Sequence, residues 1–143
     1  MNETGGGRLD VLALLHTASD AQAAVESKLG AAGLSLAKLS ALKALSDAGE
    51  SLPLSQLAER LSCVKSNITQ LVDRLEADGF VKRDADPNDR RTRLAVLTGA
   101  GRKACLDGSR IQQAAEREFL TTLTREESAQ LATLLGKLRK PRA

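Results

Sequence analysis

Two short amphipathic segments, residues 54–61 and 65–78, are separated by only three residues, 62–64. A connector of this length lets two helices cross at a steep angle, as they do in a helix-turn-helix unit. Apolar side chains recur where the two helices must pack, and the small Ala58 stands where they approach most closely. Because any corner between two helices needs such residues, the spacing indicates either a DNA-binding unit or plain packing, and it favours the first.

The outward face of the second segment carries side chains suited to a DNA groove. No acidic residue lies between positions 65 and 72, although an exposed helix is polar in any case. Side-chain amides can pair with adenine at two points, hydroxyls can bond to phosphates or base edges, and cations at the two ends of the helix suit phosphates. The residues expected to contact DNA here are Lys65, Ser66, Asn67, Thr69, Gln70 and Arg74.

The helical pattern ends at Gly79, and a strand-like pattern follows. Residues 80–83 and 94–97 are short β candidates, and a polar loop over residues 84–92 separates them. Two such runs, joined by a loop rich in turn-forming residues, predict a β-hairpin. A helix-turn-helix followed directly by a basic hairpin is the order of elements in a winged helix. This combination is far more specific than either part alone.

Arginine side chains gather around the loop of the hairpin. A long arginine on a protruding loop can enter the minor groove of DNA, where narrow A·T-rich segments concentrate negative potential. We expect Asp89 to pair with Arg91 or Arg93 and to hold the loop in shape. The hairpin residues expected to lie at the DNA are Asp89, Arg90, Arg91 and Arg93.

The basic charge of the chain is concentrated in this middle part. Residues 60–103 carry ten basic and six acidic side chains, whereas residues 1–59 carry four basic and seven acidic ones. Such a patch is typical of a surface that binds a polyanion, and a merely solvated face has the same composition. Charge alone leaves both interpretations open, and the motifs in the same segment favour double-stranded DNA.

The size and composition of the chain exclude several other classes of protein. With 143 residues it has room for one domain, and with no Trp, no Tyr and two Phe its core must consist of Leu, Ala and Val, which favours helices. Two cysteines and one histidine provide neither a disulfide framework nor a zinc site, so we expect no metal and no cofactor. The chain shows no glycine-rich phosphate loop and no activated nucleophile, so an enzyme is not expected. It also has no run of about 18 apolar residues and no signal-peptide pattern, which predicts a cytoplasmic protein that does not bind membranes.

Longer helices flank the middle segment on both sides. Residues 8–33 repeat apolar side chains at helical spacing, Thr98 can cap a helix of about 25 residues, and residues 124–127 form a capping box for a last helix. These helices have more apolar surface than a small DNA-binding lobe can cover, which predicts a two-fold dimer, although they could instead complete the core of a monomer. The expected interface residues are Leu9, Leu12, Leu15, Leu131, Leu134, Leu135 and Leu138.

The motifs in residues 34–104 resemble those of the MarR family of bacterial transcription regulators. The resemblance rests on Leu57-Ala58-Glu59-Arg60-Leu61, on residues 68–83, and on Asp86-Pro87-Asn88-Asp89-Arg90-Arg91 with the Leu97-Thr98 and Gly101 that follow. It implies a mainly α fold with a small β-hairpin wing (α+β), a winged helix-turn-helix with six helices that dimerises through its N- and C-terminal helices. Residues 8–33 and 104–140 would then form the homodimer, while residues 34–103 form the lobe that binds a pseudo-palindromic operator.

The resemblance also implies a mode of action. Members of the family usually repress transcription, and many release DNA when a small aromatic or lipophilic compound, or an oxidant, changes the spacing of the two lobes. By position, the resemblance places Ser66, Asn67, Thr69, Gln70 and Arg74 on the recognition helix and Arg91 in the minor groove. His16 would lie near the cleft where relatives bind ligands, and it is either a ligand contact or a buried or interfacial histidine.

Cys63 leaves a second interpretation open. It lies at the start of the recognition helix, where the helix dipole can lower the pKa of a thiol, so a thiol-based redox-responsive regulator is one alternative. The same position is one of the apolar positions of the turn, and a cysteine often serves as a small buried hydrophobe, as we also expect of Cys105. A winged-helix protein-interaction module without DNA binding is the remaining alternative.

Overall fold

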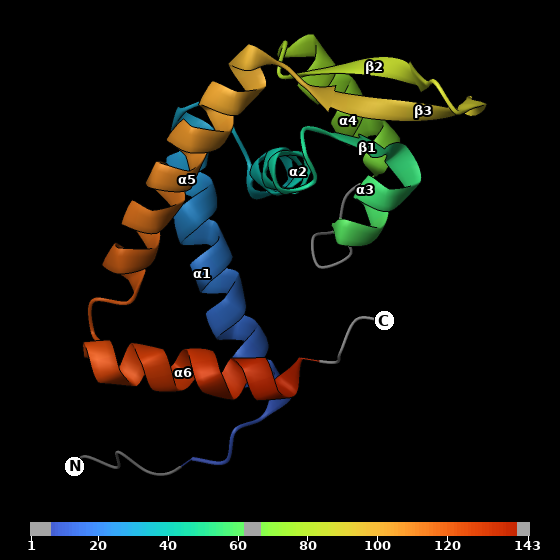
Figure 1. Cartoon of the computed structure of the whole chain (residues 1–143). Helices are drawn as coiled ribbons and strands as arrows, with labels where there is room; N and C mark the ends of the chain where they lie inside the picture. Colours follow the sequence, from blue (N-terminus) through green and yellow to red (C-terminus); the bar gives the residue numbers. More distant parts are fainter. Residues whose placement is uncertain (1–6, 62–66, 140–143) are drawn as a thin grey trace.

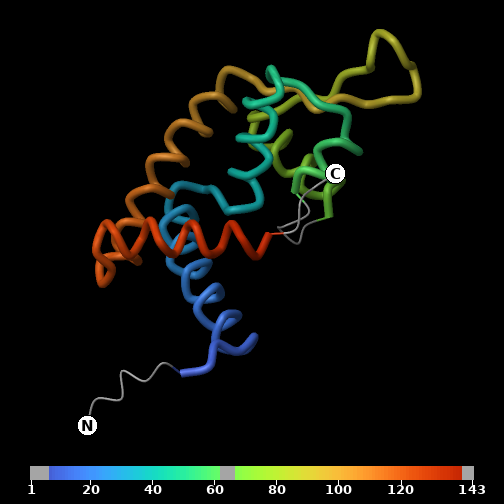
Figure 2. The backbone as a smooth tube through the Cα atoms, turned by 60° about the horizontal axis from the view of Figure 1, so that its bottom comes forward, coloured from blue at the N-terminus to red at the C-terminus, as the bar shows by residue number. Residues whose placement is uncertain are grey.

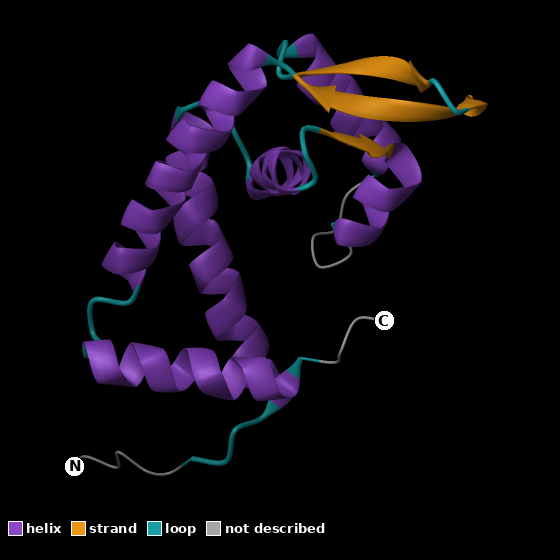
Figure 3. Cartoon of the chain, in the orientation of Figure 1, coloured by secondary structure: helices purple, strands orange, loops and turns teal. Residues whose placement is uncertain are grey.

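Six helices and three strands make up the part of the chain described by a computed structural model, residues 7–61 and 67–139 (Figure 1). In chain order they are α1 Val11–Ala31, α2 Leu36–Asp47, β1 Ser51–Pro53, α3 Leu54–Arg60, α4 Ile68–Ala77, β2 Val81–Asp86, β3 Asp89–Leu97, α5 Gly99–Phe119 and α6 Arg125–Leu138. Figure 3 shows that helices make up most of the body and that the strands gather at one end. The mainly α fold with a small hairpin, as predicted from the sequence, is confirmed.

Side-chain caps fix where the long helices begin. The side chain of Asp10 accepts a hydrogen bond from the backbone N of Ala13 at 2.7 Å, so α1 starts at Val11 rather than at residue 8. Ser35 and Thr98 cap α2 and α5 in the same way, as the sequence predicts. Each cap satisfies backbone donors that the helix itself leaves unpaired, which is why these short polar residues mark the boundaries.

The three strands form one antiparallel sheet in the order β1, β3, β2. The sequence does not reveal the strand β1, in which Ser51–Pro53 pairs with β3 and places Leu52 opposite Ala95. A strand of three residues carries too short a pattern to be recognised. Its partner also lies far along the chain, so the pairing is a property of the tertiary fold. Pro53 fits because β1 is an edge strand.

The hairpin of β2 and β3 is longer than the sequence predicts. The stretch expected as a loop, residues 84–92, is mostly strand, since β2 continues to Asp86 and β3 begins at Asp89. The hairpin forms an arm whose outer, polar part needs no apolar side chains, because each strand satisfies the backbone groups of the other. Figures 1 and 2 both show this arm extending away from the helices.

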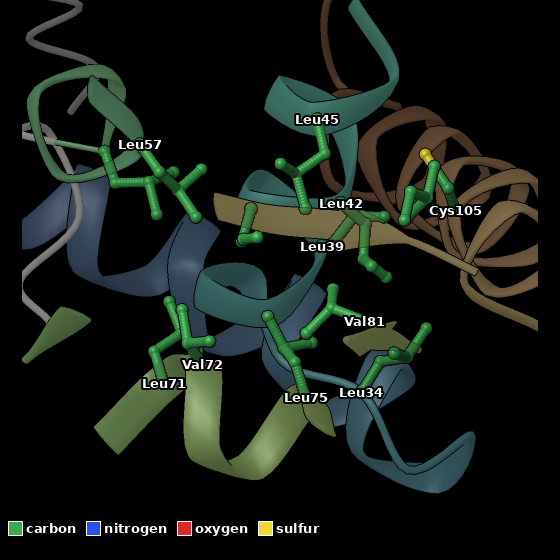
Figure 4. Close-up of a cluster of buried hydrophobic side chains, with 14 of the residues drawn as sticks. Leu34, Leu39, Leu42, Leu45, Leu57, Leu71, Val72, Leu75, Val81 and Cys105 are labelled. Atoms are coloured by element: carbon green, nitrogen blue, oxygen red, sulfur yellow. The ribbon is translucent and has the colours of Figure 1, made fainter. Parts of the chain in front are cut away.

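A cluster of aliphatic side chains joins the helices to the sheet. The largest fully buried members are Leu29 of α1, Leu39, Leu42 and Leu45 of α2, Leu57 of α3, and Val72 and Leu75 of α4. Figure 4 labels the members from α2, α3 and α4, which point toward one another, and Cys105 of α5 at one edge. Since α2 also contacts α1, α5 and the sheet, it lies at the centre of the fold and fixes the position of α4.

By contrast, α6 and the first half of α1 contribute little to this core. The two hydrogen bonds of the predicted capping box begin α6, 2.9 Å from the backbone N of Thr124 to Glu127 Oε1 and 3.1 Å from the backbone N of Glu127 to Thr124 Oγ1. No residue of α6 is buried, and every residue of α1 from Val11 to Asp20 is exposed. In Figure 1, α6 lies at the end of the molecule away from the sheet. The leucines of these two segments therefore remain open to contacts from outside the chain.

Candidate nucleic-acid interface

The predicted recognition helix is α4, and Asn67 organises its start. Asn67 Oδ1 accepts hydrogen bonds from the backbone N of Thr69 at 3.1 Å and of Gln70 at 3.3 Å, so Asn67 is the N-cap and the helix begins at Ile68. Pairing with adenine at two points needs both the oxygen and the nitrogen of a side-chain amide. Because the oxygen of Asn67 already accepts hydrogen bonds within the helix, Asn67 is poorly suited to that pairing. Gln70 takes part in the cap only through its backbone N, and its exposed side chain is the amide that α4 itself presents. The predicted contacts Lys65 and Ser66 lie outside the described residues.

One face of α4 is buried and the other is exposed and polar. Leu71, Val72 and Leu75 face the core, whereas Thr69, Gln70, Asp73 and Arg74 are exposed. The structure therefore presents the predicted Thr69, Gln70 and Arg74 together on one outward surface. Side chains of this length and polarity can reach the edges of bases or the phosphates on either side of a groove.

The start of α2 adds two residues that the sequence does not reveal. A cavity of about 160 Å³ lies between α2 and α4 and brings Ser35 and Lys38 close to Gln70 and Arg74. Lys38 Nζ donates to Asp78 Oδ2 at 2.9 Å, so this lysine also ties α2 to the end of α4. Ser35 is recognisable from the sequence only as a helix cap, because its closeness to the recognition helix depends on how the two helices pack.

The hairpin arm, residues 81–97, carries the predicted wing arginines on its exposed surface. Arg91 and Arg93 share one face of β3 and Arg90 lies on the other, because side chains alternate along a strand. The expected pairing of Asp89 with an arginine side chain is wrong. Instead, Asp89 Oδ1 accepts from the backbone N of Arg91 at 3.0 Å, and Asp89 Oδ2 accepts from Thr92 Oγ1 at 3.0 Å. The carboxylate shapes the turn into β3 and leaves the guanidinium groups to other partners.

Arg83 is a further residue of this surface that sequence reasoning misses. It lies on β2 and its guanidinium bonds to Asp73 and Glu76 of α4, at 2.7 and 3.1 Å. A basic residue next to a basic hairpin looks in the sequence like one more DNA contact, and nothing local shows that its partners lie on the preceding helix. The contact joins α4 to the hairpin, and the predicted DNA-binding residues lie on α4 and on the other strand of that hairpin, β3.

The base of the hairpin is also fixed to α5 by short contacts. Thr98 Oγ1 donates to the carbonyl oxygen of Gly79 at 2.6 Å and accepts from the backbone N of Gly101 at 3.0 Å. Gly79, with a φ of +78°, ends α4 in the left-handed conformation that glycine adopts without strain. The end of α4, the hairpin and the start of α5 therefore form one connected unit.

The other predicted site residues lie away from this surface. His16 is exposed on the first half of α1. Cys105 is buried, as predicted for a packing residue, and burial raises the pKa of its thiol, an effect that the nearby charge of Lys43 partly offsets. The thiol is therefore held in its neutral, unreactive form. Cys63, the predicted site of a redox response, lies outside the described residues.

All seven predicted interface leucines are exposed in the single chain. They are Leu9, Leu12 and Leu15 around the start of α1, and Leu131, Leu134, Leu135 and Leu138 on α6. Leu12 has 71% and Leu134 has 57% of its surface exposed, values that large aliphatic side chains seldom keep in water when they cluster. Both segments carry exposed leucines, and in Figure 1 both lie at the end of the molecule away from the hairpin arm.

A pair of short helices packed around Leu57 and Leu71, followed by a hairpin bonded to the second helix, defines a winged helix-turn-helix protein. Comparison with known sequences gives the family. The sequence model of the MarR family matches residues 34–92. The HTH-type transcriptional regulator YcgE of Bacillus subtilis is 32% identical over 107 residues, which cover 75% of this chain and 69% of YcgE. The chain belongs to the MarR family of transcriptional regulators.

Other relatives match over a smaller part of their length. The transcriptional regulator HosA of Escherichia coli is 32% identical over 82 residues, 57% of this chain and 61% of HosA. The aligned part spans about half of a further relative, the HTH-type transcriptional regulator YkoM of Bacillus subtilis, at 54% of its length. The residues matched by the family model, 34–92, include the predicted helix-turn-helix and most of the hairpin.

Solved structures agree over nearly the whole chain. A mutant of MarR from E. coli, complexed with operator DNA, superposes with a TM-score of 0.79 and 26% identity over 91% of this chain and 94% of the MarR chain. BpsR from Bordetella bronchiseptica shares the fold with a TM-score of 0.83 at 20% identity, over 96% of this chain and 97% of BpsR. In the ranges 7–61 and 67–139, no helix is both long and apolar enough to cross a membrane.

Proposed function

We propose that this chain is a cytoplasmic repressor that binds a pseudo-palindromic operator as a homodimer. The observation that carries the proposal is the joined surface of α4 and the hairpin, with Thr69, Gln70 and Arg74 exposed on the helix and the arginines exposed on the arm. Family membership and the likeness to MarR in complex with operator DNA support the same assignment. Repression and DNA binding need no catalytic group, and no enzymatic activity is proposed.

In this proposal α4 enters the major groove and the arm follows the adjacent minor groove. Gln70 reads a base, because its amide can donate and accept at once, while Thr69 and Arg74 bond to phosphates or base edges. Asn67 contributes by ordering the first turn of α4. Arg91 enters the minor groove, with Arg90 and Arg93 at the flanking phosphates and Asp89 shaping the turn beneath them.

Dimerisation is assigned to residues 8–33 and 104–140, and DNA binding to residues 34–103. The exposed leucines around the start of α1 and on α6 supply the apolar surface that a two-fold interface would bury. A symmetric dimer presents two copies of α4 to successive major grooves, which matches an operator built from two half-sites. The dimer is therefore part of how the proposed protein reads DNA.

The proposal also includes a small lipophilic or aromatic effector. Phe119 is one of two aromatic residues in the chain, and it lines a cavity of about 330 Å³ between α1 and α5 together with Ala24 and Ala115. Lys28 and Glu118 line the same cavity, with Lys28 Nζ 3.9 Å from Glu118 Oε2. A compound seated there would alter the packing of α1 on α5 and with it the spacing of the two lobes. His16, exposed on α1, is proposed as a secondary contact after dimerisation.

Fluorescence anisotropy tests the proposal directly. The purified protein is titrated against a labelled duplex from upstream of its own gene, and against a scrambled duplex, across a series of salt concentrations. We expect tighter binding to the first duplex by at least about tenfold, two chains per duplex, and a steep fall in affinity with salt. Equal, weak binding to both duplexes, followed by failure of a random-sequence selection to enrich any site, would refute sequence-specific recognition.

Two substitutions identify the elements involved. Arg91→Ala should weaken binding by about 1–3 kcal/mol, whereas Gln70→Ala should change the preferred base at one position of each half-site. Arg110→Ala is the matched control, because Arg110 is an exposed arginine on α5, outside the DNA-binding residues 34–103 and not among the leucines of the proposed dimer interface. If Arg91→Ala and Arg110→Ala bind equally well, the wing does not contact the operator.

A further inference from the structure

Four hydrogen bonds join Arg83 of β2 to α4. Its guanidinium donates to Asp73 Oδ1 at 2.7 Å, to Glu76 Oε1 at 3.1 Å and to the carbonyl oxygen of Thr69 at 3.4 Å, and its backbone N donates to Glu76 Oε2 at 3.2 Å. Only 25% of the Arg83 side chain is exposed, against 60% for that of Asp73 and 45% for that of Glu76. The arginine is thus laid against the helix rather than pointed into solvent.

The three partners of Arg83 follow one stripe of α4. Thr69, Asp73 and Glu76 stand at spacings of four and three residues, so they lie one above another along two turns of the helix. A planar guanidinium with fixed N–H directions can bond to several of them at once, whereas a lysine ammonium is a single point charge that can turn freely. Arg83 therefore fixes a direction between β2 and α4 as well as a distance.

Arg83 is also the outermost tether of the arm. Its backbone lies opposite Ala95 of β3, and beyond that pair the two strands run on to the turn at Pro87 and Asn88. Between residues 84 and 93 of the described chain, no hydrogen bond or ion pair reaches α4, and the side chains of this part bond within the arm. The side-chain bonds between the arm and α4 therefore lie at the base of the arm, and they are those of Arg83.

We propose that Arg83 is a positioning residue that holds the wing at a fixed angle to the recognition helix. This inference rests on the proposed function, because the angle matters only if α4 and the arm occupy neighbouring grooves. With the angle fixed beforehand, the arm loses little conformational freedom when Arg91 reaches the minor groove, and more of the contact energy appears as affinity. The assignment makes Arg83 distinct from Arg90, Arg91 and Arg93, which contact the DNA themselves.

The first test measures the mobility of the arm backbone in the absence of DNA. Backbone ¹⁵N relaxation in the full chain compares amides of residues 84–93 with those of α4, for the wild type and for Arg83→Lys. We expect arm order parameters near 0.85 in the wild type and a fall toward about 0.6 in the variant. Arg102→Lys is the matched control, because Arg102 pairs with Glu50 at 2.8 Å in the same lobe and does not contact α4. Unchanged order parameters in Arg83→Lys, with both variants folded, would overturn the proposal.

The second test measures whether Arg83 and Arg91 contribute to DNA affinity independently or together. With a duplex obtained by random-sequence selection on the wild type, Arg83→Lys should weaken binding about tenfold and change binding to a scrambled duplex less than about twofold, since the positive charge is kept. Arg91→Ala should then have a much smaller effect in the Arg83→Lys background than in the wild type, because the two residues act through one contact. If the loss of affinity in the double variant equalled the product of the losses in the two single variants, the two residues would act independently, which would contradict the proposal.

A substitution of Glu76, one of the partners of Arg83, distinguishes positioning from a purely electrostatic role. If Arg83 only masked the acidic charge of α4, Glu76→Gln would tighten binding by removing a repelling charge. Positioning predicts the opposite, a loss of affinity for the selected duplex, because two of the four hydrogen bonds are weakened. If the wild type selects no duplex at all, the proposed function fails, and the relaxation measurement still decides whether Arg83 holds the arm.

Discussion

Replacing Gly101 with alanine should separate α5 from the base of the hairpin. Gly101 lies in the first turn of α5, and a Cβ built there would stand 2.0 Å from the carbonyl oxygen of Phe80 and 2.8 Å from Leu97 Cδ1. A carbon and a carbonyl oxygen in contact lie about 3.3 Å apart, so the methyl group requires a shift of more than about 1 Å. The oxygen cannot turn aside, because it belongs to the backbone and accepts a hydrogen bond from the backbone N of Thr98 at 3.0 Å.

The size of the effect follows from two opposing terms. Overpacking of this kind costs about 3 kcal/mol, at the upper end of its usual range because a backbone atom must move. Alanine is better than glycine in a helix by up to about 1 kcal/mol. We therefore expect Gly101→Ala to lower the free energy of unfolding by about 2 kcal/mol, which corresponds to a fall in Tm of about 8 °C for a chain of this size.

Urea unfolding followed by circular dichroism, at one fixed protein concentration, measures this loss. The matched control is Gly30→Ala in α1, where a Cβ meets nothing within 4 Å and stability should rise by up to about 1 kcal/mol. If Gly101→Ala were as stable as the wild type, the close approach of α5 to the carbonyl of Phe80 could not be a feature of the folded protein.

Three further expectations concern the core, the buried thiol and the dimer. Leu42→Ala should cost about 2–5 kcal/mol of unfolding free energy because Leu42 is fully buried, whereas Leu106→Ala, at a position 62% exposed, should change it by less than about 0.5 kcal/mol in the same urea assay. Since burial raises the pKa of Cys105 above its ordinary 9.0, the unfolded state loses the thiol proton first, and stability should fall as the pH rises past about 9. In Cys105→Ala that part of the fall should disappear, and an identical pH dependence in both proteins would contradict a buried thiol. Leu135→Asp should turn the proposed dimer into a monomer in light scattering after size exclusion, while Ala129→Asp, at an exposed position on the side of α6 away from its leucines, should remain dimeric. A Leu135→Asp protein that stays dimeric would place the interface elsewhere.

The features that sequence analysis predicted well are encoded locally. Ser35, Thr98 and Thr124 cap their helices through bonds to residues three positions ahead, so each boundary can be recognised from a few letters. Gly79 ends α4 because its left-handed backbone is costly for other residues, which is again a local property. Helix number, the hairpin and the buried face of α4 all follow from such short-range signals.

The features that were missed depend on distant partners. The strand β1 exists because Leu52 lies opposite Ala95, and the ion pairs of Arg83 require α4 and β2 to be folded together. The polar arm beyond residue 84 resembles a loop in the sequence, because the usual alternation of apolar and polar residues is absent where neither face is buried. Charge alone predicts an arginine partner for Asp89, whereas a short carboxylate more easily reaches the backbone N two residues ahead.

Because β3 leads directly into α5, a tilt of this long helix moves the hairpin arm. Only Thr98 separates the end of β3 at Leu97 from the start of α5 at Gly99, and hydrogen bonds on both sides of Thr98 stiffen the joint. A helix of 21 residues is about 32 Å long, so a tilt of roughly 5° at its far end displaces the arm by about 3 Å. That displacement is nearly the rise of one base pair. In the proposed dimer, a compound or substitution that tilts α5 slightly would therefore shift the two wings relative to their half-sites while leaving each lobe intact.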